Sequence, residues 1–332
     1  MRRVCLGRSK AHVTELAFGA AGIGNLFQPI ADTEAAAAVA AAWEGGIRAF
    51  DTAPHYGLGL SERRLGAALK DRPRDEFTVS TKVGRLLEPL PEIEGDDLAN
   101  GFAVAATHRR VWDFSADGVR RSLEDSLNRL GLDRVDTVFL HDPEQHAEQA
   151  LTEAYPALEA MRAEGIIDAI GVGVNTTELP TRFVWETDID VVLLAGRYTL
   201  LDQSGLDELL PAAAARKVSV MAAGVFNSGL LADPRPGATF EYAAASRPLL
   251  EQALRLQARC GLYGVPLRAA AARFPLAHPA VVGVILGMRS AAEASDAAEH
   301  WRRPIPYGMW EELRAAGLIP RLVPVPEERA GG

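Results

Sequence analysis

The chain has 332 residues, of which 48% are hydrophobic and 24% are charged, and its formal net charge is −9. This length and composition suffice for a large buried core, and the acidic balance argues against nucleic acid as a partner, because nucleic-acid binders concentrate Lys and Arg on one face. No stretch of about eighteen uncharged apolar residues predicts a membrane span, and residues 1–19 lack the apolar core of a signal peptide. The two cysteines, Cys5 and Cys260, lie far apart and outside any CxxC spacing, which predicts no disulfide framework and favours a cytoplasmic location.

Short apolar runs alternate with helix-like stretches along the chain. Residues 3–19 have the pattern of a short β-hairpin that turns at residues 7–10 and could close the bottom of a barrel. Eight apolar runs predict buried strands over residues 16–22, 47–53, 77–84, 137–142, 169–175, 191–198, 218–226 and 281–288. Helices are predicted over residues 32–46, 61–70, 116–131, 151–165, 177–186, 204–217 and 246–261. This alternation predicts a parallel sheet covered by helices, and eight such units predict an α/β protein, a (β/α)8 TIM barrel with a short N-terminal β-hairpin.

A doubly wound sheet is the competing architecture. Its dinucleotide-binding fingerprint, G-x-G-x-x-G, would follow the first strand. The segment GAAGIGNLF supplies Gly22 and Gly24, but Phe27 occupies the place of the third glycine. No linker divides the chain, so we expect one barrel domain over residues 1–332, with a long loop after the third strand at residues 85–115.

Titratable residues stand at the predicted carboxyl ends of neighbouring strands, where barrels of this kind place their chemistry. Asp51 ends the second run, Lys82 lies in the third, His141 ends the fourth, and Tyr56 follows Asp51 on a loop. Taken singly, Asp51 could cap a turn, Tyr56 could be a half-buried aromatic and His141 a hydrogen-bonded core histidine. Lys82 is harder to dismiss, because an ammonium group within an apolar strand needs a buried partner, and Asp51 is the nearest candidate.

Together the four residues suggest acid–base chemistry. A phenol has a pKa of about 10 and is a weak base at neutral pH, but a nearby ammonium group favours the phenolate. We therefore expect Lys82 to lower the pKa of Tyr56, Asp51 to hold Lys82 in place, and His141 to orient a substrate oxygen.

The segments GIRAFDTAPHYG, STKVG and VDTVFLHDP resemble, in order and spacing, the signatures of the aldo-keto reductase superfamily, over about residues 4–315. The resemblance implies a TIM barrel that binds NADP or NAD without a Rossmann fold, and a catalytic tetrad of Asp51, Tyr56, Lys82 and His141. The segments GNLFQPI, YGLGLSERRLG and AGRYTLLDQ are similar to the branch that contains D-threo-aldose, L-fucose and L-galactose dehydrogenases and pyridoxal 4-dehydrogenase. This branch implies hydride transfer between a nicotinamide and the hemiacetal carbon of an aldose. A pyridoxal 4-dehydrogenase and a general aldehyde or ketone reductase are the alternatives.

The residues that the resemblance assigns to the cofactor depart from the usual pattern. The Ser-Asn pair that often holds the carboxamide is absent, which leaves Asn175 one position later, and Ala223 replaces the aromatic that often stacks on the nicotinamide, which leaves Tyr198 or Phe226. The predicted cofactor site comprises Gly22, Asn175, Tyr198, Phe226, Asn227, Ser228, Gly229, Leu230, Gly287, Arg289, Ser290 and Glu293.

The segment GMRSAAE bears on the choice of cofactor. Arg289 stands where relatives place a cation against the 2′-phosphate of NADP, and Ser290 beside it can donate a further hydrogen bond, which favours NADP. The Glu-Asn pair that usually holds the adenine is replaced by Asp296 and Ala297, so NAD stays open.

The long loop at residues 85–115 supplies the candidate substrate contacts, His108, Trp112 and Phe114. The expected partner is a small molecule, a sugar or an aldehyde, and the expected assembly is a monomer or a weak homo-oligomer. A metal-dependent barrel hydrolase would need clustered ligands such as His-x-His, which the sequence lacks, so no metal is expected. A non-catalytic nicotinamide-binding regulatory subunit would keep much of the tetrad and is the alternative of another class.

Overall fold

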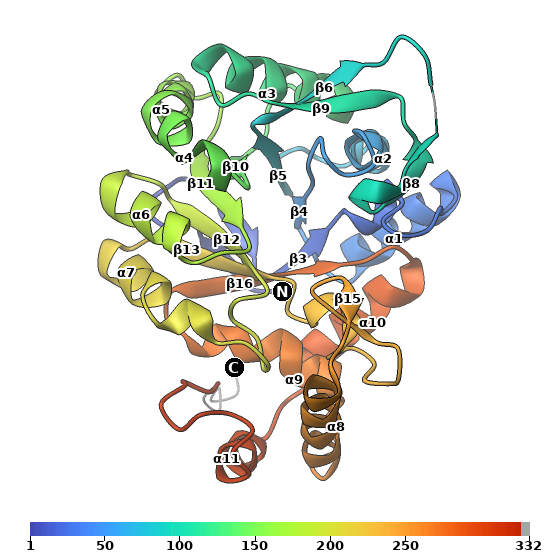
Figure 1. Ribbon diagram of the computed structural model, residues 1–332, viewed down its shortest axis with the longest axis vertical. Coiled ribbons are helices and arrows are strands. Elements are labelled where there is room, and N and C mark those ends of the chain that lie inside the picture. The colour runs from blue at the N-terminus through green and yellow to red at the C-terminus, as the bar shows by residue number, and fades with distance from the viewer. Residues whose placement is uncertain (94, 327–332) are drawn as a thin grey trace.

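The structure is a computed structural model that describes residues 1–93 and 95–326. Eight parallel strands close into a barrel, and helices surround it (Figure 1). In barrel order the strands are β3 (Leu16–Gly19), β4 (Ala49–Asp51), β5 (Thr78–Val83), β10 (Thr137–His141), β11 (Ala169–Val174), β12 (Val191–Ala195), β13 (Ser219–Ala223) and β16 (Val281–Gly287). The predicted TIM barrel is confirmed.

The helices of the structure occupy all seven predicted ranges and also segments for which no range was predicted. They are α1 (Asp32–Glu44), α2 (Leu60–Leu69), α3 (Ala116–Leu130), α4 (Ala147–Gln149), α5 (Tyr155–Ala163), α6 (Glu178–Glu186), α7 (Leu209–Arg216), α8 (Arg247–Gly261), α9 (Leu267–Arg273), α10 (Ala291–Arg302) and α11 (Tyr307–Ala315). The predicted helix over 151–165 starts with a wider turn at Ala150–Ala154, and regular α5 follows with Pro156 in its first turn, where the missing N–H costs no hydrogen bond. Helices α8 and α11 lie outside the ring, at the lower edge of Figure 1.

Alternation along the strands divides the core into two layers. In β3, Leu16 and Phe18 belong to the cluster between strands and helices, whereas Ala17 belongs to the cluster inside the barrel. Phe139, Met221 and Ile285 fill the same interior, so the barrel is a packed core and its chemistry must lie at an end.

An N-terminal hairpin of β1 (Arg3–Cys5) and β2 (His12–Thr14) closes one end of this barrel, as predicted. Leu6 and Val13 join the interior cluster, and the backbone N of Gly7 donates a hydrogen bond to Oγ of Ser219 at 2.7 Å. Gly7 has a φ of +54°, and a Cβ there would lie 2.3 Å from the backbone oxygen of Asp190, so only glycine fits this turn. The carboxyl ends of the strands form the opposite, open end.

The long segment after β5 is itself folded. Strand β6 (Arg85–Pro89) pairs with β9 (His108–Trp112), and the short strands β7 (Asp96–Asp97) and β8 (Phe102–Ala105) form a second antiparallel pair. The second pair is tied to the loop after β3, because the backbone N of Phe27 donates to the oxygen of Gly101 at 2.7 Å. We call residues 85–115 the insert. These bonds hold it against the open end of the barrel.

Candidate active site

Asp51 and Lys82 are buried at the carboxyl ends of β4 and β5, and the half-buried Tyr56 lies beside them. Nζ of Lys82 donates hydrogen bonds to Oδ2 of Asp51 at 2.7 Å and to the backbone oxygen of Thr52 at 2.9 Å. The other carboxylate oxygen of Asp51 accepts from Oγ of Ser80 at 2.8 Å. Nζ of Lys82 also lies 4.9 Å from the centroid of the Tyr56 ring. The carboxylate that Lys82 needs is therefore Asp51, and the cation stands beside the phenol.

Burial dominates the acidity of this group. It raises the pKa of Tyr56 and outweighs Lys82, which lowers that pKa through its charge and a hydrogen bond. Burial alone would lower the pKa of Lys82, but Asp51 and Tyr56 outweigh it, and the pKa of Lys82 is raised. Lys82 thus acts in the expected direction, yet the expected net fall in the pKa of Tyr56 does not occur. In this state Tyr56 is a phenol beside an ammonium group.

His141 lies at the end of β10 beside Tyr56. The two rings are nearly perpendicular, with centroids 6.1 Å apart. Burial, and after it the charges of Arg85 and Lys82, lower the pKa of His141 well below its usual value, so the ring is neutral. Its Nδ1 has no hydrogen-bond partner among the described residues. A neutral imidazole can orient a substrate oxygen without adding a charge, which is the role expected from the sequence.

A cavity of about 950 Å³ lies over these residues. Tyr56, Lys82 and His141 form its base, and its wall combines polar and apolar residues. The further lining residues are Ala21, Leu26, Phe27, His55, Arg85, Leu98, Ala99, Asn100, Gly101, Phe102, Asp142, Gly173, Val174, Asn175, Leu193, Ala195, Gly196, Arg197, Gly224, Asn227, Ser228, Glu241 and Tyr242. The volume is at the upper end of the range for small-molecule sites, as a site shared by a cofactor and a substrate requires.

Sequence reasoning missed several titratable residues in this wall. Arg85 forms an ion pair with Asp142, which directly follows His141, and His55 directly precedes Tyr56. Burial raises the pKa of Asp142 and the charge of Arg85 opposes that rise. The sequence offered one indication for His55 and Asp142, because each is adjacent to a residue of the predicted tetrad. Arg85 gave no signal, because its partner is distant in sequence.

The predicted cofactor residues fall into three groups. Asn175, Asn227 and Ser228 line the cavity. Tyr198 and Leu230 are buried in the core between the strands and the helices, where the Tyr198 ring packs against Phe274 with centroids 5.3 Å apart. The prediction that Tyr198 can stack on a nicotinamide is therefore wrong. The chain after β12 turns at Gly196, with a φ of +75°, and the Tyr198 ring that follows this turn packs into the core.

Phe226 and Gly229 are absent from the cavity lining, and Phe226 packs partly buried against the same core. The role of Phe226 as a stacking residue stays a prediction.

The remaining predicted cofactor residues gather at the start of α10. A Cβ on Gly22 would lie 3.0 Å from Cβ of Arg289, which places the loop after β3 against this helix. Oγ of Ser290 accepts from the backbone N of Glu293 at 3.2 Å and caps the helix. The backbone N and Nε of Arg289 donate to the Glu293 carboxylate, each at 2.9 Å. Gly287 ends β16 directly before this group.

The three predicted substrate contacts do not line the cavity. Phe114 is fully buried and packs against the Trp112 and His146 rings, at 6.1 and 5.6 Å, and Nδ1 of His108 is hydrogen-bonded to Oγ1 of Thr107 at 2.8 Å. The burial of Phe114 contradicts its prediction as a direct substrate contact, whereas His108 and Trp112 stay predictions. Strand β9 lies behind the cavity wall, and the insert reaches the cavity instead through Arg85 and residues 98–102.

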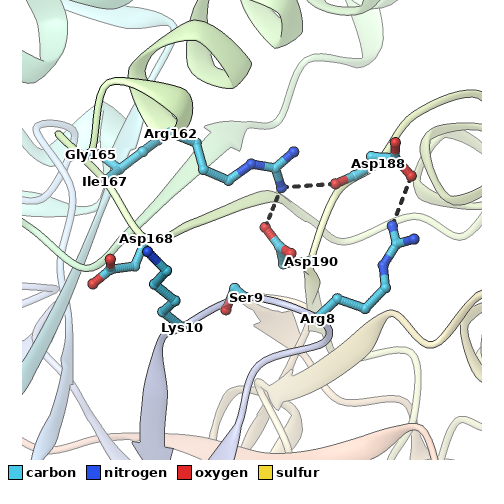
Figure 2. A pocket seen from close by; sticks show the side chains of 9 residues that line it. All are labelled: Arg8, Ser9, Lys10, Arg162, Gly165, Ile167, Asp168, Asp188 and Asp190. Carbon is cyan, nitrogen blue, oxygen red and sulfur yellow. Dashed lines mark hydrogen bonds and ion pairs between the residues drawn. The ribbon is translucent and has the colours of Figure 1, made fainter.

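A second pocket, of about 420 Å³, lies at the opposite end of the barrel, between the hairpin turn and the loops before β11 and β12 (Figure 2). Its lining residues are Arg8, Ser9, Lys10, Arg162, Gly165, Ile167, Asp168, Asp188 and Asp190. Most of its charges neutralise one another: Arg8 pairs with Asp188 at 2.8 Å and Arg162 with Asp190 at 2.7 Å. The chemistry of the tetrad therefore belongs to the larger cavity.

Within residues 1–93 and 95–326, no group of three or more His, Cys, Asp or Glu side chains is arranged to hold a metal ion. In the same part of the chain, no helix is both long and apolar enough to span a membrane.

Comparison with known proteins agrees with the fold and the site. The model of the aldo/keto reductase family matches residues 15–317. The chain is 49% identical to a D-threo-aldose 1-dehydrogenase from Pseudomonas sp, with 93% of this chain and 95% of that protein covered. It is 40% identical to a pyridoxal 4-dehydrogenase from Microbacterium luteolum, with 95% and 97% covered. Among solved structures, the holo form of an aldo-keto reductase from Bacillus halodurans has a TM-score of 0.78 and 25% identity, with 100% of both chains covered.

The chain belongs to the aldo/keto reductase family. It is an NAD(P)-dependent oxidoreductase, and the predicted resemblance is confirmed down to the branch.

Proposed function

We propose that this protein is an aldose 1-dehydrogenase, which oxidises the C1 hemiacetal of an aldose to a lactone. The observation that carries the proposal is the buried Asp51–Lys82 pair beside Tyr56 at the base of a large cavity. The 49% identical relative, a D-threo-aldose 1-dehydrogenase, supports the choice of substrate class. We also propose a single domain over residues 1–332, because strands from both halves of the chain close one barrel.

Proton transfer is the work of Tyr56 in this proposal. Oxidation needs the deprotonated minor form of Tyr56, which has released its proton to solvent and whose oxygen takes the proton of the C1 hydroxyl; in the reverse direction the phenol gives its proton to the carbonyl oxygen. Lys82 stabilises the phenolate through its charge, and Asp51 keeps Lys82 in place at 2.7 Å. The neutral ring of His141 orients the reacting oxygen. The oxidised nicotinamide, when bound, accepts the hydride from C1.

The cavity fits a nicotinamide dinucleotide. Oδ1 of Asn227 is buried in its wall and has no hydrogen-bond partner among the described residues, so it can accept from an amide or hydroxyl group of the cofactor. Asn175 and Ser228 offer further polar groups on the same wall. The start of α10, with Arg289 and the capping Ser290, can hold a phosphate group.

We propose NADP rather than NAD as the preferred cofactor. Arg289 supplies a cation at the start of α10, and its side chain is 42% exposed. Glu293 competes for this cation, since it accepts two hydrogen bonds from Arg289. An exposed ion pair of this kind is weak, so a phosphate group can displace it.

A panel of aldoses with NADP and with NAD, followed at the absorbance of the reduced nicotinamide, tests the substrate class. We expect turnover of at least one aldose by the wild type and none by Tyr56→Phe. Binding of NADP without turnover of any aldose would contradict the proposal. Pyridoxal belongs in the same panel, because the 40% identical relative is a pyridoxal 4-dehydrogenase. Turnover of pyridoxal alone would establish that second candidate function.

A further inference from the structure

His55 lies in the cavity wall beside two tetrad residues. Its ring centroid is 6.1 Å from that of Tyr56 and 5.8 Å from that of His141. The ring of Phe102, from the insert, packs edge-on against it at 5.2 Å. The position and plane of the His55 imidazole are thus fixed next to the reacting groups.

Arg110 determines which nitrogen of His55 carries a proton. Nε of Arg110 donates a hydrogen bond to Nδ1 of His55 at 2.5 Å, and its Nη2 donates to the backbone oxygen of the same residue at 2.9 Å. A guanidinium group has only donors, so Nδ1 must accept. The proton of the neutral ring is therefore on Nε2. Burial, and after it the charges of Arg85, Arg110 and Lys82, lower the pKa of His55 to about 2, so the ring is neutral at physiological pH.

A buried carboxylate holds Arg110 in this position. Arg110 donates to Oδ1 and Oδ2 of Asp97 at 2.7 and 2.5 Å, and Nδ2 of Asn100 donates to Oδ1 of Asp97 at 2.8 Å. Burial of an ion pair costs desolvation energy, so the arrangement is poorly explained by stability alone. The preceding residue on β9, Arg109, shows the contrast: its side chain is 67% exposed, against 11% for Arg110. Strand alternation sends one arginine to solvent and the other to His55.

The other nitrogen of His55 is free to bind a ligand. Nε2 has no hydrogen-bond partner among the described residues, and Nε2–H is the one polar donor that the ring can offer the cavity. A neutral N–H donor beside Tyr56 suits an uncharged oxygen such as a sugar hydroxyl.

We propose that His55 binds the substrate, with its Nε2–H donating to a hydroxyl oxygen next to the reacting carbon, and that Arg110 and Asp97 are positioning residues that fix this tautomer. The substrate in this proposal rests on the proposed function, whereas the tautomer of His55 is independent of it.

Nitrogen NMR of the full-length protein labelled with 15N-histidine tests the tautomer. The chain has seven histidines, and the signals missing from a His55→Gln variant assign His55. We expect a neutral, Nε2-protonated ring that does not titrate between about pH 5 and 8. An Nδ1-protonated ring, or titration near the usual histidine pKa, overturns the proposal, and this measurement needs no substrate.

Kinetics with deoxy sugars test the contact. His55→Phe keeps the ring and removes the N–H, so we expect KM for the aldose to rise about 3- to 10-fold, with the NADP Kd unchanged and partial recovery in His55→Gln. For one monodeoxy aldose, KM with the wild type should be higher than KM for the parent aldose by the same factor. With His55→Phe, KM should differ little between these two sugars. If removal of each sugar hydroxyl changes KM by the same factor in the wild type and in His55→Phe, the proposed contact is wrong. If no aldose is turned over, the proposed function and the substrate contact both fail, whereas the NMR result still decides the tautomer.

The positioning role is tested by removing both charges, in an Asp97→Asn and Arg110→Met double variant. We expect the 15N signals of His55 to change from the Nε2-protonated form to a mixture of both neutral tautomers, because no donor then holds Nδ1 as an acceptor. Arg109→Met is the matched control, because Arg109 is the adjacent residue and pairs with Glu88 at 2.6 Å on the outer face of the same hairpin. A purely Nε2-protonated His55 in the double variant, as in the control, overturns the positioning role.

Discussion

Arg289→Ala is the decisive test of the cofactor preference. In the structure Arg289 is paired with Glu293 one helical turn later, with Nε 2.9 Å from Oε1, and both side chains are about two-fifths exposed. A 2′-phosphate must therefore compete with a carboxylate that already holds the arginine. The preference for NADP depends on which interaction is stronger.

The expected interaction energies favour the contact of Arg289 with the 2′-phosphate over its ion pair with Glu293. An exposed i,i+4 ion pair contributes about 0.3–0.5 kcal/mol, because water screens it and both side chains lose entropy. A charge-assisted hydrogen bond to a phosphate contributes about 1.5–3 kcal/mol. The net gain for NADP is about 1–2.5 kcal/mol, so Arg289→Ala should weaken NADP binding about 5- to 70-fold and leave NAD nearly unchanged. Glu293→Gln should tighten NADP binding about twofold, because it removes the competitor.

Fluorescence titration of NADP and NAD into the three proteins measures these effects. Arg259→Ala is a suitable control, since Arg259 is similarly exposed and pairs with Glu312 at 2.8 Å, far from the tetrad on α8. The assignment of Arg289 to the 2′-phosphate would be refuted if the wild type preferred NAD. It would also be refuted if Arg289→Ala lost the same factor in affinity for NADP and for NAD.

Three further outcomes are expected. Tyr56→Phe should lower kcat at least about 10²-fold with the NADP Kd retained, because the ring still fills its site and only the proton-transfer group is lost; steady-state kinetics that show near-normal turnover would contradict this role. Phe114→Ala should cost about 3–5 kcal/mol of unfolding free energy in denaturant titrations and leave KM of the folded enzyme within about twofold, since the ring is fully buried behind the cavity wall; a large rise in KM at unchanged stability would return Phe114 to the substrate site. His55 and His141 are held neutral in the fold, whereas unfolded histidine has a pKa of about 6.5, so the unfolded state binds more protons below that pH and stability falls as the solution is acidified. Between pH 7 and pH 5.5 the loss should be about 1.2 kcal/mol for each ring, and an equal loss in a His55→Gln and His141→Gln double variant would show that other groups cause it.

Several features of this protein follow from its sequence alone. Apolar runs that alternate with amphipathic stretches predict a parallel barrel, because both patterns report local burial. The tetrad is also predictable: Lys82 in an apolar strand needs a carboxylate, and parallel neighbouring strands bring Asp51 to the same edge. Order along the chain is sufficient for these inferences, since the carboxyl ends of all eight strands meet at one end of the barrel.

Other features were decided only by the tertiary structure. The net rise in the pKa of Tyr56 depends on how completely the folded chain excludes water from the phenol, which no motif records. Tyr198 lies in the core and not over the cofactor site because of the path that the backbone takes after β12. His55 acquires its tautomer from Arg110, 55 residues away, and that contact exists only because the insert folds back onto the open end of the barrel. The desolvation of a group and the direction of its side chain depend on neighbours that are distant in sequence and that only the fold brings together. A sequence pattern reports local burial and order, so it cannot predict these two properties.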